Sequence, residues 1–288
     1  MSKNNYYSLV AGLPDLIPDH KKLEIASIEL REILREEIHP SDFEWVQLFF
    51  LPWDHANLIH LLFEKDFKWD ARGNFPREKL EQLADKKQFG LADSSDIPEY
   101  FSVFIENFHN DEEGFNKANS IQILTEKWYI HLQESGNRFI QEYAEFKQNL
   151  SNIMLALNGR KHGIQYEDAL IGDNEVTRAL KKSRSRDFGL SNEISGMENI
   201  IQIFEMDNIM DREMKLDNHI WQLIDEITFF NYFSIERILG FLQKLFIVER
   251  WFRLDKEKGQ QIFNRLLKEL QSNFEFPEEF AITYGKRK

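Results

Sequence analysis

Apolar residues recur at helical spacing along most of the chain, and the strongest such pattern lies near its C-terminal end. Between Ser234 and Phe263, we interpret the pattern as a long helix that is apolar almost all the way round, which is typical of a helix buried in a protein core. Ser234 stands just before this pattern, where its hydroxyl can accept from the amides of the first helical turn. We therefore predict a long core helix over this stretch. Its apolar face consists of Ile235, Ile238, Leu242, Leu245, Phe246 and Phe252.

Two charged residues interrupt this apolar face. Glu249 falls in its middle, and Arg253 follows four residues later, so both side chains lie on the same side of the helix. A buried charge is tolerated when an opposite charge and hydrogen bonds compensate it. The sequence thus predicts an internal ion pair between Glu249 and Arg253 that holds the helix to its neighbours. The alternative is that this pair orients a surface facing a partner.

A second long helical pattern runs from about Asn119 to Leu157. Gly136 interrupts it, and we expect a kink there because glycine weakens a helix interior. The sequence NGRKHG at 158–163 follows, and glycine suits the left-handed conformation that commonly ends a helix. A basic turn that binds an anion is the alternative interpretation. The predicted buried face consists of Ile121, Leu124, Trp128, Leu132, Phe139, Tyr143, Phe146 and Leu150.

The seven prolines divide the chain into two regimes. All but one lie in the first hundred residues, and none occurs between Glu99 and Phe276. Because proline breaks helix interiors, we predict short helices in residues 1–110 and a bundle of longer helices in residues 111–288, packed as one continuous all-α body. Tyr6–Val10 is the one candidate for a short extended segment, and no alternating series is long enough for a sheet.

The net charge of −13 narrows the choice of partners. Binding to a nucleic-acid backbone depends on basic side chains that displace counterions, and broad adsorption to an anionic lipid surface has the same requirement. We therefore expect neither. A basic protein partner and simple solubility both agree with this charge. Many of the 25 phenylalanines belong in a core, but so many large rings also indicate surfaces that close against another protein.

Cysteine usage and hydropathy indicate the compartment. The chain has no cysteine, which excludes disulfides and thiolate metal sites and favours a reducing cytoplasm. No run approaches the ~18 uncharged apolar residues that a membrane helix needs. We therefore expect no direct insertion into a membrane.

The sequence contains no motif for catalysis, cofactor binding or metal binding. HExxH, GxxxxGK[ST], GxGxxG and GxSxG are all absent from it. The histidines do not have the spacing that places two metal ligands on one helix face, and we interpret them as ordinary surface or core residues. We therefore predict no catalytic residue, no cofactor and no metal site, and an enzyme is only our third hypothesis. The eight histidines are His20, His39, His55, His60, His109, His131, His162 and His219.

Basic residues cluster at one place in this acidic chain. Five of them lie within nine residues, at Arg178, Lys181, Lys182, Arg184 and Arg186. A solvated loop after a short helix is the plain interpretation. The functional hypothesis is a docking patch for an acidic partner surface, where charge steers the encounter and fixes the orientation.

Several segments together carry a resemblance to a known family. They are YYSLVAGLPDL near the start, ALNGRKHGI, GDNEVTRALKKSRSRDFGL and ILGFLQKLFIVERWFRLDKEKGQ. From Tyr6 to about Gly259 the chain resembles a bacterial branch related to the C-type subunit of the V-type ATP synthase, which corresponds to the d-type subunit of the eukaryotic vacuolar enzyme. In the C-type subunit, a C-terminal helix carries an acidic residue followed by an asparagine-leucine-arginine run. Glu249, Arg250 and Arg253 are arranged similarly here, although Trp251 and Phe252 stand where the asparagine would be expected.

This resemblance implies an all-α, funnel-like fold of pseudo-repeated helical units and a mechanical role. The implied protein is a non-catalytic coupling subunit without a cofactor, linking the central stalk to the membrane rotor ring. It would be cytoplasmic and held at the inner face of the cell membrane through its partners. Our alternative hypothesis is a stand-alone α-helical scaffold that binds another protein through its aromatic surface. Neighbouring genes distinguish the two, because genes for rotary-ATPase subunits favour the first.

Overall fold

The structure, a computed structural model, describes residues 4–14, 16, 24–64 and 66–253, and every regular element in these ranges is helical. The predicted all-α multi-helix bundle is confirmed. The α-helices are α1 (Tyr7–Gly12), α2 (Ser27–Glu37), α3 (Pro40–Leu48), α4 (Leu51–Phe63), α5 (Arg77–Ala84), α6 (Glu99–Asn110), α7 (Lys117–Gln133), α8 (Arg138–His162), α9 (Glu175–Lys182), α10 (Met197–Phe204), α11 (Ile209–Thr228) and α12 (Ile235–Arg253). Three short 3-10 helices are η1 (Phe89–Leu91), η2 (Glu112–Gly114) and η3 (Glu167–Ala169).

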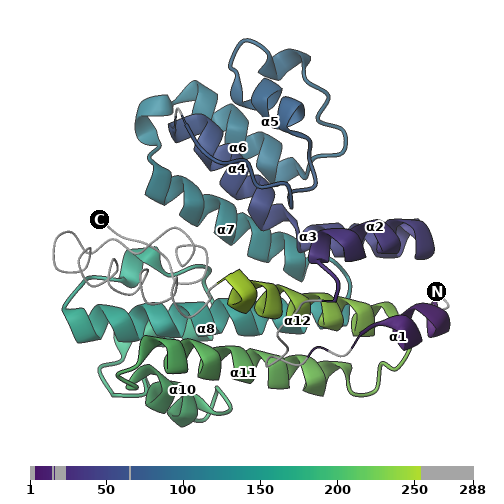
Figure 1. The fold of residues 1–288 in the computed structure, drawn as a ribbon. Coiled ribbons are helices and arrows are strands. Elements are labelled where there is room, and N and C mark those ends of the chain that lie inside the picture. The colour runs from purple at the N-terminus through teal and green to yellow at the C-terminus, as the bar shows by residue number, and fades with distance from the viewer. Residues whose placement is uncertain (1–3, 15, 17–23, 65, 254–288) are drawn as a thin grey trace.

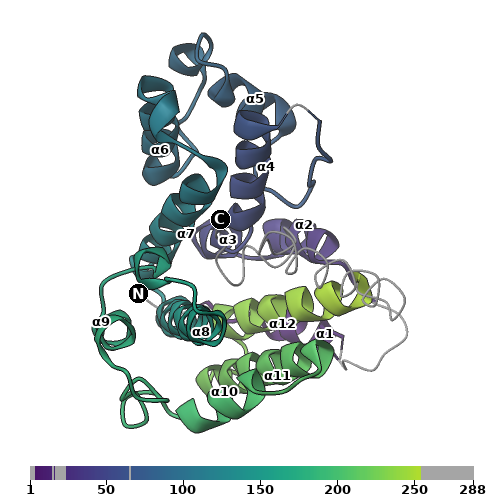
Figure 2. The same cartoon turned by 90° about the vertical axis from the view of Figure 1, so that its left-hand side faces the viewer.

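The helices form two lobes that meet along α3 and α7 (Figure 1). The smaller lobe contains α4 to α7, and its core is a separate apolar cluster that includes Leu58, Leu80 and Phe101. The larger lobe contains the long helices α8, α11 and α12, with α9 and α10 at its margins (Figure 2) and α1 at one end (Figure 1). The expected division near residue 110 separates the helix lengths only in part. The longest described helix before it, α4, has 13 residues, and α8 beyond it has 25, but α9 and α10 beyond it have only eight residues each. The two apolar cores do not follow this division of the chain. Leu34 of α2 and Val46 of α3 belong to the same core as the long helices of the larger lobe.

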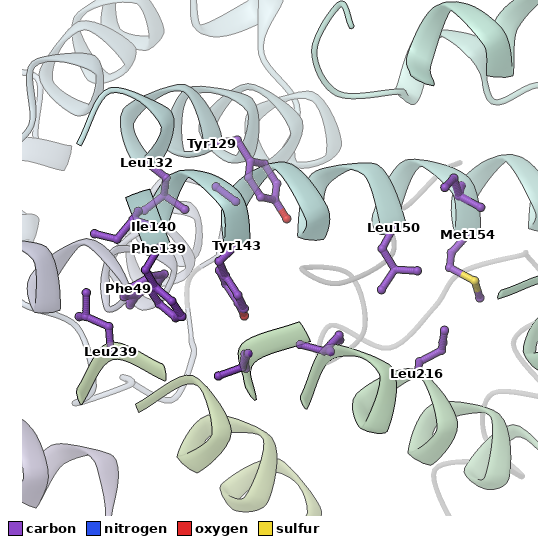
Figure 3. Close-up of a cluster of buried hydrophobic side chains, with 14 of the residues drawn as sticks. Phe49, Tyr129, Leu132, Phe139, Ile140, Tyr143, Leu150, Met154, Leu216 and Leu239 are labelled. Carbon is purple, nitrogen blue, oxygen red and sulfur yellow. The ribbon is translucent and has the colours of Figure 1, made fainter. Parts of the chain in front are cut away.

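The core of the larger lobe lies between α8 and its neighbours α11 and α12 (Figure 3). Phe139 and Tyr143 on α8 are stacked with ring centroids 6.0 Å apart, and Phe49 meets Tyr143 edge-on at 5.7 Å. Leu239 from α12 lies beside this aromatic group (Figure 3). Such dense packing of rings between long helices gives the lobe a stiff interior.

The long pattern from Asn119 to Leu157 forms two helices, so the prediction of a single kinked helix is wrong. Gly136 adopts a left-handed conformation with φ of +72°, and this conformation stops a helix instead of bending it. Asn137 then starts α8, since its side-chain oxygen accepts from the amide of Ile140 at 3.2 Å. The predicted glycine end is confirmed, because Gly163 follows the helix with φ of +65°.

Two other expectations concern the ends of the described chain. The extended segment expected at Tyr6–Val10 is wrong, because Tyr7 begins the helix α1. Ser234 immediately precedes α12 as expected, although its hydroxyl donates to the carboxylate of Glu236. The part of the predicted long helix beyond Arg253 lies outside the described residues. Among the helices that are described, none combines the length and the apolar character required to cross a membrane.

Candidate functional site

The predicted basic cluster begins on α9, a helix with one buried and one exposed side. Val176 and Leu180 are buried against the body of the protein. Arg178, Lys181 and Lys182 are exposed. Because residues three and four apart share a helix face, these three cations lie together on the outside of α9. Figure 2 shows α9 at the margin of the larger lobe, beside α8.

The five basic residues of the cluster are not equivalent. Arg186 forms ion pairs with Glu198 at 2.9 Å and with Glu205 at 3.1 Å, and these hydrogen bonds raise the pKa of its guanidinium. Its charge is therefore already matched within the chain. In contrast, Arg178, Lys181, Lys182 and Arg184 form no ion pair within 4.0 Å among the described residues. We call these four residues the cationic face.

The helix that carries most of the cationic face is fixed at its N-terminus. The side-chain oxygen of Asn174 accepts from the amide of Thr177 at 2.9 Å, and the hydroxyl of Thr177 accepts from the amide of Asn174 at 2.9 Å. This reciprocal cap satisfies amides that a helix start leaves free. At the other end, Lys181 and Lys182 are in the last turn, where positive charge is favourable. The helix dipole therefore accounts for part of their placement.

A structured loop continues the cationic face beyond α9. Arg160, near the end of α8, donates to the backbone carbonyls of both Ser183 and Ser185. Its guanidinium also lies 3.5 Å from the centroid of the Phe188 ring, a favourable cation–π contact. Phe188 is buried and has a φ of +57°, which is strained for a bulky side chain. The loop is therefore held in one conformation by tertiary contacts.

Arg160 supports the loop of the cationic face, a contact that the sequence interpretation missed. The pattern at 158–163 indicates a helix end or an anion-binding turn, whereas in the structure Arg160 binds the loop after α9. The neighbouring Gly159 allows a separate close approach, because a Cβ atom there would overlap Cδ1 of Tyr166 and lie 2.9 Å from the carbonyl oxygen of Ile164. No local sequence signal indicates the contact of Arg160, because its partners Ser183 and Ser185 lie 23 and 25 positions away in the chain.

The predicted ion pair between Glu249 and Arg253 needs correction. The Glu249 side chain is only 8% exposed, as expected, but the Arg253 side chain is 53% exposed and lies 3.7 Å away. The carboxylate of Glu249 instead accepts from the amide of Ser27 at 2.6 Å and from its hydroxyl at 2.7 Å. Ser27 is the first residue of α2, where free amides and the helix dipole favour a negative charge. Glu249 therefore caps α2 from a distant helix, and Arg253 adds a weaker contact.

Arg250 forms a second charged network between α12 and α11. It pairs with Glu213 at 3.3 Å and more closely with Asp217, and the indole of Trp251 donates to Asp217 at 2.6 Å. Lys147 of α8 faces the same charges. Burial lowers the pKa of its amine to about 8, an effect that Arg250 strengthens and that Asp217 and Glu213 oppose. These contacts connect α8, α11 and α12 through charged groups as well as through the apolar core.

Some titratable groups elsewhere are buried in the core, and His55 is one of them. Burial lowers the pKa of His55 to about 3, so its ring is neutral, and it hydrogen-bonds the Tyr100 hydroxyl at 2.8 Å. In the ranges that the structure describes, no three histidine, aspartate or glutamate side chains gather closely enough to hold a metal ion.

The fold and this surface define the class: an all-helical protein whose candidate site is a patch of exposed charged side chains on a stiff body. The chain belongs to the family described as "Protein of unknown function (DUF2764)", whose model matches residues 3–274. No curated protein and no solved structure matches the chain.

Proposed function

We propose that this protein is a non-catalytic coupling subunit of a V-type ATP synthase, linking the central stalk to the membrane rotor ring. In this role it has no cofactor, and it is held at the inner face of the cell membrane through its partners. The proposal starts from the resemblance to the bacterial branch related to the C-type subunit. The structural observation that carries it is the cationic face, exposed and without internal ion pairs among the described residues, on a protein of net charge −13.

The cationic face suits an acidic protein surface. Four cations lie on one short helix and its loop, while the chain as a whole is acidic. Opposite charges steer the encounter of two proteins and suppress wrong orientations. The rest of this chain, being acidic, would repel the same partner. The arrangement therefore favours a single docking orientation, which a coupling subunit requires.

The support beneath the cationic face suits the transmission of force. Arg160 holds the loop carbonyls from the end of α8, and α8 extends without interruption for 25 residues along the larger lobe. Glu249 and Arg250 then connect α12 to α2 and α11. A load applied at the cationic face therefore passes into long helices joined by buried contacts.

The direct test is assembly with stalk and ring subunits of the V-type ATP synthase from the same genome. The tagged wild-type chain should co-purify with them in mild detergent. A variant with Arg178→Glu, Lys181→Glu and Lys182→Glu should lose this association, and wild-type association should weaken as salt screens the contact. A chain that never associates with stalk or ring subunits would refute the proposal.

A matched control separates the cationic face from net charge. Lys86, Lys87 and Lys127 are exposed on the smaller lobe, and changing all three to glutamate alters the total charge by the same amount. This control should assemble like the wild type. If the wild type binds neither stalk nor ring, and its gene has no rotary-ATPase neighbours, the alternative of a stand-alone scaffold gains support.

A further inference from the structure

A second unusual surface lies at one end of the larger lobe, where α1 meets the turn between α11 and α12 (Figure 1). Five of the ten large apolar side chains exposed in the described residues belong to it. We call it the aromatic tip, and its members with their exposed fractions are Tyr7 (60%), Phe229 (61%), Phe230 (81%), Tyr232 (63%) and Phe233 (39%). The rings touch, with centroids 4.7 Å apart for Tyr7 and Phe233 and 4.9 Å apart for Phe229 and Phe230.

The segments that build the tip contain no charge. Residues 4–14 read NNYYSLVAGLP and residues 227–235 read ITFFNYFSI. Charged residues make up 30% of the chain, so 20 average residues would carry about six charges, whereas these carry none. Depletion of charge together with enrichment of aromatic rings is the compositional mark of the core of a protein interface.

The tip is held in place by its backbone. The amide of Tyr6 donates to the carbonyl of Phe233 at 2.6 Å, and the amide of Asn231 donates to the carbonyl of Thr228 at 2.9 Å. The Tyr6 hydroxyl donates to Asp42 and accepts from the amide of His39 at 3.2 Å. Tyr6 thus attaches α1 to α3 while its neighbour Tyr7 is exposed. A surface fixed in this way loses little conformational entropy when a partner binds.

The tip and the cationic face lie at opposite ends of the long helices. Phe229 directly follows the last residue of α11. At the other end, Lys161, which follows Arg160, lies 5.4 Å from the centroid of the Phe204 ring, and Arg212 near the start of α11 lies 5.7 Å from the same ring. The 20 residues of α11 span about 30 Å at 1.5 Å per residue. Two partners can therefore bind at the two ends at once.

Size and charge favour a protein as the occupant of the tip. Five aromatic side chains of roughly 200 Å² each, exposed by about 60% on average, offer on the order of 600 Å², close to the ~800 Å² that each partner gives to a standard interface. An anionic lipid surface would repel a chain of net charge −13. Arg237 donates to the Thr228 hydroxyl beside the tip, but its guanidinium lies 4.0 Å from the carboxylate of Asp225. Two copies of such an acidic chain would also repel each other.

We propose that the aromatic tip is a second docking surface, specific for an uncharged apolar surface of a partner protein that differs from the one bound at the cationic face. Given the proposed function, on which this inference rests, the two partners are two different components of the ATP synthase. Association at the tip depends on buried apolar area, so it is insensitive to salt. The cationic face, in contrast, supplies the salt-dependent contact.

The test uses the variant Phe230→Ser with Tyr232→Ser and the control Leu91→Ser. Leu91 is 88% exposed but lies in η1 of the smaller lobe, away from the tip. Assembly with co-expressed stalk and ring subunits is measured at low and at high salt. The tip variant should bind at least tenfold more weakly at both salt concentrations, while the control binds like the wild type. Because both tip residues are exposed, the thermal unfolding temperature should be unchanged in either variant.

Each other outcome has a defined meaning. Wild-type assembly that the tip variant retains in full would overturn this inference and leave the proposed function standing. A wild type that fails to assemble refutes the proposed function itself. Wild-type binding to vesicles of neutral phosphatidylcholine that is lost in the tip variant would show a lipid contact and overturn the choice of a protein partner. The choice of a different protein as partner would also be overturned if light scattering shows that the wild type is a dimer and the tip variant is a monomer.

Discussion

The two ends of the larger lobe differ in chemistry but are built in the same way. The cationic end presents exposed lysine and arginine side chains, and the aromatic end presents rings from segments that lack any charge. At both ends, groups from distant parts of the chain hold the backbone of a turn: Arg160 holds the carbonyls of the loop after α9, and Tyr6 donates to the carbonyl of Phe233. A surface can therefore be rigid whether it attracts its partner by charge or by apolar area.

This comparison separates what steers binding from what holds a complex together. Charge at a rim mainly changes the rate of encounter and responds to salt, whereas buried aromatic anchors contribute most of the binding free energy. If partners bind at both ends, added salt should weaken the contact at the cationic end, and removal of the aromatic side chains should weaken the contact at the aromatic end. The stiff helices between the two ends would then transmit force from one contact to the other. Substitutions that weaken the packing of these helices should therefore weaken the coupling.

The largest effect is expected from Glu249→Ala, which removes the group connecting α12 to α2. The amide and hydroxyl of Ser27 would be left buried without their acceptor, so the free energy of unfolding should fall by about 3 kcal/mol. Arg253→Ala is the matched control and should cost less than about 1 kcal/mol, because its side chain is half-exposed. Urea denaturation of both variants measures the difference. Equal losses of unfolding free energy in the two variants would mean that the ion pair between Glu249 and Arg253 is the main interaction.

A smaller effect is expected from an added methyl group beneath each end. In Gly159→Ala the new Cβ overlaps the Tyr166 ring below the cationic face, whereas in Gly240→Ala it lies 2.9 Å from Cγ2 of Thr228 and 3.0 Å from Cγ2 of Ile224, below the tip. Overpacking costs roughly 1–3 kcal/mol, and the better helix propensity of alanine offsets about 1 kcal/mol. Thermal unfolding should show the greater loss for Gly159→Ala. The reverse order would mean that the aromatic end is the more tightly packed.

Lys147→Met tests the middle of the lobe and should stabilise it. The pKa of Lys147 in the fold is about 8, against an ordinary 10.5. Below pH 8 the amine is charged in both folded and unfolded chains, so the fold bears the full cost of the buried charge; the cost disappears as pH rises towards 10.5. The full shift in pKa corresponds to about 3 kcal/mol, but the Lys147 side chain is only half-buried, so solvent screens part of this cost. The variant should therefore gain about 1 kcal/mol at pH 7 and almost nothing near pH 10.5. A gain independent of pH would mean that packing, not charge, causes it.

The sequence predicted those features that depend on local pattern. The apolar spacing of Ile235 to Phe252 identified α12, and the glycine at the end of the basic turn identified the end of α8 at Gly163. Such features need only neighbours within a few turns. The basic cluster was also found from the spacing of its residues in the sequence. In the structure all five members are exposed, and four of them form no ion pair within the described residues.

What was missed depends on contacts between distant residues. The partner of Glu249 is Ser27, 222 positions away in the chain, and no helical spacing indicates it. Arg186 resembles the other members of the cluster in sequence, but its pairing with Glu198 and Glu205 is set by the fold of the loop. Likewise, α1 begins directly after Tyr6, whose amide donates to the carbonyl of the distant residue Phe233. Tertiary contacts override weak local propensity at such sites.

Site-specific photo-crosslinking in the assembled complex tests most directly the claim that the two ends bind two different proteins. A photoreactive residue is placed at position 182 on the cationic face and, in a separate sample, at position 230 on the aromatic tip. We predict crosslinks to two different components of the V-type ATP synthase, with the crosslink from position 182 weakened by salt and that from position 230 unaffected. Crosslinks to the same component from both positions, or to no component from either, would contradict the account.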